Sequence, residues 1–220
     1  MTTVIDLDQA IRPDLSTHRV VIVGGTGSVG EGIVRAWLRS GAEVIVPSRS
    51  QESVDTLRAG LGDDGASPSL HRVLGDYTSF ASAEAMAARV VGEFGDVTDV
   101  IATIGGWWQG KPLWEVTQAE WDRFFVDLTT AHVATVRAWI PRLPDAGSYQ
   151  LILGGSAFVP VPGASVINME QAALLMMRQV LAAEVGDQRR VFAQVLGPVD
   201  ARGRQWTDPD WVSSAEVGLV

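Results

Sequence analysis

A glycine-rich turn that follows the first apolar run places the strongest constraint on the fold of this chain. The apolar run at 20–23 leads into Gly24, Gly25, Thr26, Gly27, Ser28, Val29 and Gly30, and the stretch after the turn has a helical pattern. Glycine lets a backbone turn sharply, and a new helix offers unpaired N–H groups and a positive dipole end to an anion. A strand, such a turn and a helix in this order predict a site for a nucleotide diphosphate.

A second apolar run indicates which nucleotide the site favours. The strand predicted at 43–47 follows a helix stop at Ser40 and Gly41, as in a β-α-β unit, and it ends at Ser48 and Arg49. An acidic residue at such a strand end bonds the ribose 2′-hydroxyl of NAD, whereas arginine suits the 2′-phosphate of NADP. We therefore expect Ser48 and Arg49, with Arg72 as a further candidate, to favour NADP over NAD. The alternative is that Arg49 is a solvated surface charge.

Composition excludes several classes of partner. The 220 residues are 46% hydrophobic, enough for one well-filled core, and the net charge of −9 argues against nucleic acid. Cysteine is absent and the three histidines lie far apart, so we expect no metal site. We find no apolar run of about 18 residues and no basic-then-apolar leader, so we expect a cytoplasmic protein without a membrane segment.

Strands and helices are predicted to alternate along the whole chain. The expected strands lie at 19–24, 43–47, 70–74, 98–104, 148–154 and 190–196, and the expected helices at 29–40, 51–60, 79–94, 118–140 and 164–186. This alternation predicts an α/β fold: a Rossmann-type doubly wound parallel sheet with helices on both faces. We expect one domain at 19–220, preceded by a leader at 1–18 and interrupted by a flexible surface loop at 61–69.

From residue 19 to about 198 the pattern resembles the short-chain dehydrogenase/reductase family. The likeness rests on the order and spacing of the segments 74–77, 100–105, 112–122, 125–129, 151–156, 171–174 and 197–199. The resemblance implies an oxidoreductase whose cofactor lies beside Asp76, Tyr77, Ile104, Gly105 and Pro198. Ala102 and Thr103 replace the two asparagines of the family's strand end.

The catalytic positions depart from the family's pattern. The family uses a serine, a tyrosine, a lysine and an asparagine, and these positions correspond here to Ser156, Ile167, Gln171 and Asp127. No lysine occurs after Lys111 and no tyrosine after Tyr149, so no shift of the alignment restores the pair. The sequence therefore predicts a degenerate active site.

Three groups remain as candidates for chemistry or substrate contact. Asp127 is interpreted either as a desolvated acid or as a structural group that bonds backbone N–H donors, and Glu170 is a second candidate acid. Ser156 is interpreted as a ligand contact or as a turn residue. Trp107 and Trp108 are expected to bind a small, flat aromatic substrate, or alternatively to fill space beside the cleft.

Three hypotheses for function follow. The first is an NADP-dependent oxidoreductase with a substitute acid, the second a non-catalytic NADP(H)-binding sensor or regulatory protein, and the third a non-redox enzyme that uses Asp127. The resemblance also implies a homo-oligomer built on the helices at 118–140 and 164–186. After residue 199 the family's last strand is missing, and the stretch 208–220 resembles the start of the family's last helix.

Overall fold

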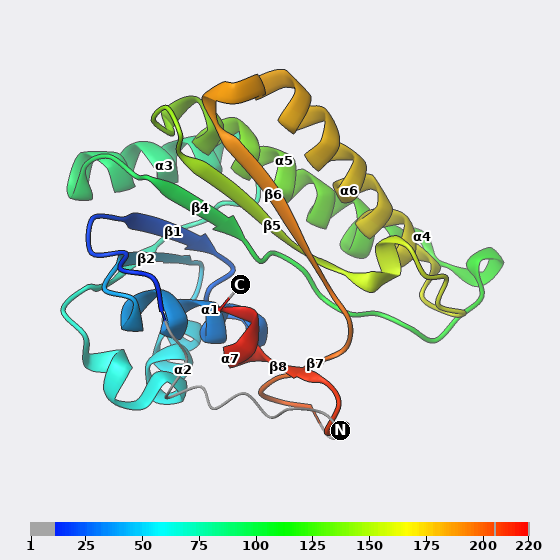
Figure 1. The fold of residues 1–220 in the computed structure, drawn as a ribbon. Helices are drawn as coiled ribbons and strands as arrows, with labels where there is room; N and C mark the ends of the chain where they lie inside the picture. Colours follow the sequence, from blue (N-terminus) through cyan, green and yellow to red (C-terminus); the bar gives the residue numbers. More distant parts are fainter. Residues whose placement is uncertain (1–11, 205, 220) are drawn as a thin grey trace.

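Six parallel strands form the centre of the computed structural model, which describes residues 12–204 and 206–219 (Figure 1). In chain order they are β1 (Arg19–Val23), β2 (Glu43–Ser48), β3 (Leu70–Leu74), β4 (Asp99–Ala102), β5 (Ser148–Gly154) and β6 (Arg190–Leu196). Their order in the sheet is β3-β2-β1-β4-β5-β6, and every pair is parallel. The predicted doubly wound α/β fold is confirmed.

Helices cover both faces of this sheet. One face carries α1 (Ser28–Arg39), α2 (Gln51–Leu61) and the short α7 (Ser214–Val217), and the other carries α3 (Phe80–Phe94), α5 (Asp127–Trp139) and α6 (Ser165–Val185) (Figure 1). No helix in the described part of the chain has both the length and the apolar character that a transmembrane span needs.

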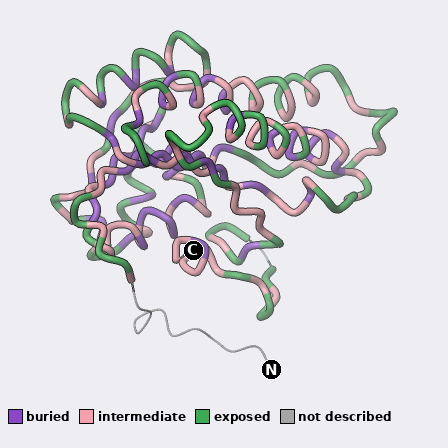
Figure 2. Tube along the Cα trace, turned by 45° about the horizontal axis from the view of Figure 1, so that its top comes forward, coloured by how far each residue is buried: buried purple, intermediate pink, exposed green. Residues whose placement is uncertain are grey.

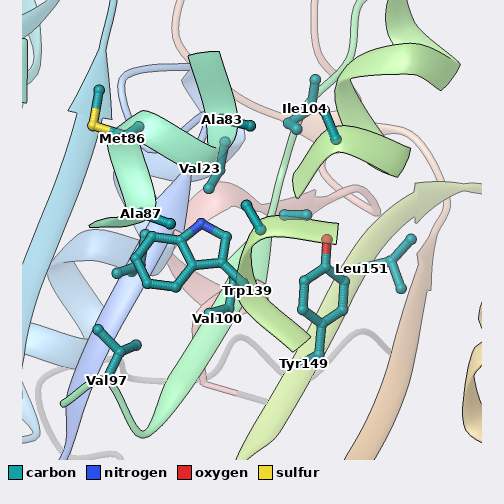
Figure 3. Close-up of a cluster of buried hydrophobic side chains, with 14 of the residues drawn as sticks. Val23, Ala83, Met86, Ala87, Val97, Val100, Ile104, Trp139, Tyr149 and Leu151 are labelled. Atoms are coloured by element: carbon teal, nitrogen blue, oxygen red, sulfur yellow. The ribbon is translucent and has the colours of Figure 1, made fainter. Parts of the chain in front are cut away.

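The burial of β1 explains why its sequence is continuously apolar. Val21 and Val23 pack into the core under α3, α5 and α6, whereas Val20 and Ile22 pack into the core under α1 and α2. A strand buried on both faces has no polar side to alternate with. Figure 2 shows buried residues concentrated in the centre of the molecule, and Figure 3 shows Trp139 within the larger core.

The helix predicted at 118–140 is interrupted in the structure. A short helix, α4 (Gln118–Trp121), runs into a π-helical turn at Asp122–Val126, and α5 begins at Asp127. The Thr129 hydroxyl donates to the carbonyl oxygen of Phe125, which gives that carbonyl a side-chain partner.

The loop predicted at 61–69 contains a short 3₁₀ helix at Gly62–Ala66.

Part of the predicted leader is bonded to the domain. The amide of Leu15 donates to Ser40 O at 2.8 Å, and the His18 imidazole lies 2.6 Å from the Asp99 carboxylate. The remainder of the leader, at 1–11, lies outside the described residues.

The C-terminal segment packs on α1 instead of extending the sheet beyond β6. After β6, β7 (Val199–Asp200) pairs with β8 (Val212–Ser213), and α7 lies against α1. The contact is so close that a Cβ on Gly32 would lie 1.8 Å from the Ser214 carbonyl oxygen. Of the described part of the stretch expected to begin a last helix, 208–219, the four residues of α7 are α-helical.

We predict that Gly32→Ala destabilises the protein by displacing the C-terminal segment. Forcing a methyl group into a closely packed contact costs roughly 1–3 kcal/mol, and urea denaturation followed by circular dichroism would measure the loss. Gly92→Ala is the matched control, because Gly92 is helical and a Cβ there meets nothing within 4 Å. That change should leave stability equal or raise it by about 0.5–1 kcal/mol. Equal effects at the two positions would contradict the close contact.

Candidate functional site

The carboxyl ends of β1 and β4 lie where open α/β sheets bind ligands, at the position called the crevice below. The chain runs outward from β1 through β2 to β3 and then crosses to β4 on the other side of β1, which is a topological switch point. Val23 pairs with Ala102, and the Thr103 amide donates to Val23 O at 2.9 Å. The predicted glycine turn begins directly at this edge.

Two glycines are required by the shape of the turn. Gly24 has φ +84°, and a Cβ on it would lie 2.4 Å from the Thr103 carbonyl oxygen. A Cβ on Gly30 would lie 2.5 Å from Gly24 O. Bare backbone therefore lines this part of the crevice, as a diphosphate cradle requires.

The first turn of α1 is open to an anion. Gly27 is the N-cap residue and supplies no side-chain cap, so the amides that begin at Ser28 are not bonded by a cap side chain. Thr26, Ser28 and Val29 lie in the same turn and first helical residues. The predicted residues at 24–30 therefore lie in one continuous turn and helix start that could hold a diphosphate.

Ser48 and Arg49 have different roles at the end of β2. Ser48 is buried, and its hydroxyl donates to Ser50 O at 3.0 Å, so it shapes the turn into α2. Arg49 is exposed, and its guanidinium carbon lies 5.9 Å from the centre of the Tyr77 ring. Burial raises the pKa of Tyr77, and the charge of Arg49 opposes this effect. Arg49 and Tyr77 thus lie together at the ends of β2 and β3, whereas Arg72 is exposed within β3.

Asp76 shapes the turn after β3. Its carboxylate accepts bonds from the Thr78 amide at 3.1 Å and from the Thr78 hydroxyl at 2.8 Å. Partial burial alone would raise the pKa of Asp76, but the hydrogen bonds from Thr78, Ser82 and the Tyr77 amide outweigh it and hold the pKa below its usual value.

His132 positions the end of β4, a role that the sequence analysis did not predict. This fully buried histidine on α5 lies with Nε2 2.9 Å from Ile104 O. Because a carbonyl only accepts, Nε2 carries the proton. Burial lowers the pKa of His132 to about 4, although the bond to Ile104 opposes the shift, so the ring is neutral at neutral pH. Ile104 is thereby fixed beside the exposed Gly105.

The two tryptophans after Gly105 diverge in exposure. Trp107 is 55% exposed, whereas Trp108 is half-buried with its ring centre 5.9 Å from that of Phe124. The Gly110 amide donates to Gly163 O at 3.0 Å, which joins this loop to the one that follows β5. Trp107 therefore remains the candidate for contact with a ligand, and Trp108 packs on the π-helical turn. Pro198 is exposed just after β6.

Ser156 lies at the expected strand end. It occupies a short 3₁₀ turn after β5 and is 9% exposed, and its carbonyl accepts a 2.7 Å bond from the Asn168 side chain. Ile167, which the sequence analysis aligned with the family's tyrosine, is buried. Asn168 thus anchors the start of α6 to the Ser156 turn.

Gln171 is bonded within the protein at both ends of its side chain. Its amide oxygen accepts from the Gly154 N–H at 2.6 Å, and its NH₂ group donates to the Glu170 carboxyl at 2.6 Å. The side chain therefore connects β5 to Glu170. This arrangement stabilises the strand end and leaves Gln171 with little freedom to reach a ligand.

Glu170 is the buried acid of this region. It is fully buried, and its Oε1 has no hydrogen-bond partner among the described residues. Burial raises the pKa of Glu170 to about 7, although the bond from Gln171 opposes the shift. Asp127, by contrast, is exposed at the start of α5, so it lacks the burial that the acid interpretation assumes. In the described part of the chain, no group of three His, Asp or Glu side chains is placed to hold a metal.

Comparison with known proteins relates this chain to oxidoreductases. A family model described as enoyl-(acyl carrier protein) reductase matches residues 24–209. D-xylose 1-dehydrogenase of Caulobacter vibrioides is 32% identical over 93% of this chain and 81% of its own length. The chain spans 63% of the length of an oxidoreductase of Bacillus subtilis that is 28% identical to it.

Two solved structures share the fold. A short-chain dehydrogenase of Shigella flexneri in complex with NADP superimposes with a TM-score of 0.81, at 19% identity over 94% of this chain and 90% of that one. A short-chain oxidoreductase of Pseudomonas aeruginosa, described as containing an atypical catalytic centre, gives 0.82 at 18% identity, over 93% and 88%.

We predict that Glu170→Gln removes a pH dependence of stability. The pKa of Glu170 is about 7 in the folded protein, whereas a glutamate in the unfolded chain has its ordinary pKa of 4.5. Between these values the folded protein holds the extra proton, so stability falls as pH rises, by about 3 kcal/mol in total. His132 acts oppositely, because its lowered pKa makes stability rise up to about pH 6.5. The quantity to measure is therefore the difference between variant and parent in urea denaturation from pH 4.5 to 8.

The control for this experiment is Glu184→Gln, an exposed glutamate on the same helix. Its difference from the parent should stay nearly constant over the pH range. A constant difference for Glu170→Gln as well would show that Glu170 titrates normally.

Proposed function

Because the chain belongs to the short-chain dehydrogenase/reductase family, we propose that it binds NADP(H) in the crevice between β1 and β4 and lacks the family's proton-donating residues. It acts in this proposal as an NADP(H)-binding sensor or regulatory protein. The glycine cradle at 24–30 and the open first turn of α1 support binding of the diphosphate. NADPH would supply a hydride when bound, and the residues around it would supply the groups that bind and orient it.

The hydrogen bonds of Gln171 within the protein give the main support for a non-catalytic site. Hydride addition to a carbonyl leaves negative charge on oxygen, and a positioned acid contributes roughly 10²–10⁴-fold to such a step. Ile167 has no proton to donate. Gln171 is neutral, and its amide already bonds Gly154 and Glu170. Ile167 and Gln171 therefore support a site that binds the cofactor but cannot protonate the oxygen of a carbonyl substrate.

Arg49 supports the preference for NADP over NAD. Its guanidinium is exposed at the end of β2, where a 2′-phosphate would lie, and no acidic residue occupies that strand end. The Shigella flexneri relative was solved with NADP, which agrees with this choice. Asp76 and Tyr77 would border the adenine end of the same site.

A second candidate function is an oxidoreductase with a substitute acid. This candidate is supported by the Pseudomonas aeruginosa protein, which is described as an oxidoreductase with an atypical catalytic centre. Glu170 would be the substitute acid, because burial raises its pKa to about 7, but it is fully buried and bonded to Gln171. Ser156 would then hold the substrate oxygen. The non-redox alternative needs a desolvated Asp127. Because Asp127 is exposed, its environment does not support this alternative.

The proposal includes a small aromatic ligand and self-association. Trp107 offers an exposed ring on the loop after β4. Met176 and Val180 are exposed on α6 and give that helix an apolar outer side, consistent with a homo-oligomer through α5 and α6. A cytoplasmic location with access to NADP(H) is part of the proposal.

We predict that the protein binds NADPH without oxidising it. Titration of NADPH should quench the fluorescence of the eight tryptophans, because Trp107 and Trp108 follow the cofactor crevice. An assay at 340 nm over a panel of aliphatic and aromatic carbonyls should show no oxidation. Turnover that disappears in Asp127→Asn or Glu170→Gln would instead support the oxidoreductase, and absence of binding would overturn the proposal.

We predict that Arg49→Ala lowers affinity for NADPH by about ten- to a hundredfold, as expected for a charge-assisted phosphate contact of roughly 1.5–3 kcal/mol. Affinity for NADH should be unchanged, since NADH lacks the 2′-phosphate. Isothermal titration calorimetry with both cofactors measures the ratio. Arg72→Ala is the matched control and should have a smaller effect. An equal loss for NADH would mean that Arg49 contributes to folding or to the adenine site instead.

A further inference from the structure

An arginine from the C-terminal segment reaches the phosphate turn. Arg202 lies just after β7, and its Nε donates to the Glu31 carboxylate at 2.9 Å. A second nitrogen of the same guanidinium donates to Thr26 O at 3.3 Å. Thr26 belongs to the glycine turn and Glu31 to the first turn of α1. A segment some 170 positions away in sequence thereby bonds directly to the proposed diphosphate cradle.

Glu31 creates an electrostatic conflict in this position. Its carboxylate lies in the first turn of α1, where the helix dipole favours any negative charge, and its side chain is only 12% exposed. A diphosphate bound at the same helix terminus would bring more negative charge into a region that solvent screens weakly. Without a compensating cation, Glu31 would repel the ligand.

Arg202 is better placed than Arg35 to compensate this charge. Arg35 lies 3.4 Å from Glu31, but its short bond, at 2.7 Å, goes to Gly60 O on α2. Arg202 makes the shorter contact with the carboxylate and also bonds the turn itself. One carboxylate therefore faces two guanidinium groups, which leaves the cluster with a net positive charge.

We infer that Arg202 is a positioning residue for the dinucleotide diphosphate: it neutralises Glu31 and braces the Thr26 turn, so that docking of the C-terminal segment sets the affinity of the cofactor site. The inference rests on the proposed function, because it concerns the same ligand. It adds a dependence of that site on the segment beyond β6, which packs on α1 through Gly32 and Ser214.

A double-mutant cycle between Arg202 and Glu31 tests the inference, with NADPH as the probe and tryptophan fluorescence as the readout. Arg202→Met should weaken binding about tenfold at low salt, as loss of one nearby charge predicts. Glu31→Gln alone should tighten binding. In the Glu31→Gln background, the effect of Arg202→Met should fall to about twofold or less, because the charge to be neutralised is gone.

Three further measurements separate this role from simple loss of structure. Arg202→Lys should retain most of the affinity, and the loss in Arg202→Met should shrink as salt rises from 50 to 500 mM. Arg204→Met is the matched control, because Arg204 lies on the same segment with its guanidinium 5.2 Å from the Trp211 ring centre. It should leave binding unchanged. Should Arg202→Met not fold, Glu31→Gln must still tighten binding.

Failure of the inference and failure of the proposed function give different results. An equal loss from Arg202→Met in both backgrounds, or no tightening in Glu31→Gln, would overturn the inference and leave NADP(H) binding intact. Absence of NADPH binding by the parent chain would overturn the proposed function and this inference together.

Discussion

The close approach of the glycine turn to the end of β4 is the contact on which the site depends. Gly24 lies against the Thr103 carbonyl with no room for a side chain, and this contact fixes where the turn begins relative to the crevice. The turn leads from the end of β1 into the first turn of α1, next to the paired end of β4. Proteins of many functions share this fold, so the function of the crevice depends on the residues that line it.

Those residues divide into two halves with different chemical character. The half formed by β1 and β2 keeps open amides and the exposed Arg49, groups that attract phosphate. The half formed by β5 and α6 is neutral and internally bonded, since Gln171 bridges Gly154 and Glu170. Burial raises the pKa of Glu170 in this half to about 7, although the hydrogen bond from Gln171 opposes the shift.

The sequence predicted the sheet well because strands buried on both faces and amphipathic helices leave strong patterns. The glycine turn was predictable because its glycines follow one another at short spacing directly after a strand. The contact of Gly30 with Gly24 O is local, whereas the contact of Gly24 with Thr103 could not be read from the sequence. The sequence did not predict the π-helical turn before Asp127, because one inserted residue barely changes helical periodicity. It also did not predict the roles of His132 and Arg202, whose partners lie 28 and 171 positions away.

The seating of α7 on α1 has a consequence for how this sequence can vary. A methyl group at position 32 would overlap the peptide carbonyl of Ser214, and one at 218 would lie 2.6 Å from the Ala36 methyl group. The sequences of α1 and of the C-terminal segment therefore cannot change independently at these contacts. Related sequences with a larger residue at position 32 should carry a compensating shift, a shorter connection or a different terminal segment, and a matched pair of glycines should mark the relatives that retain this arrangement.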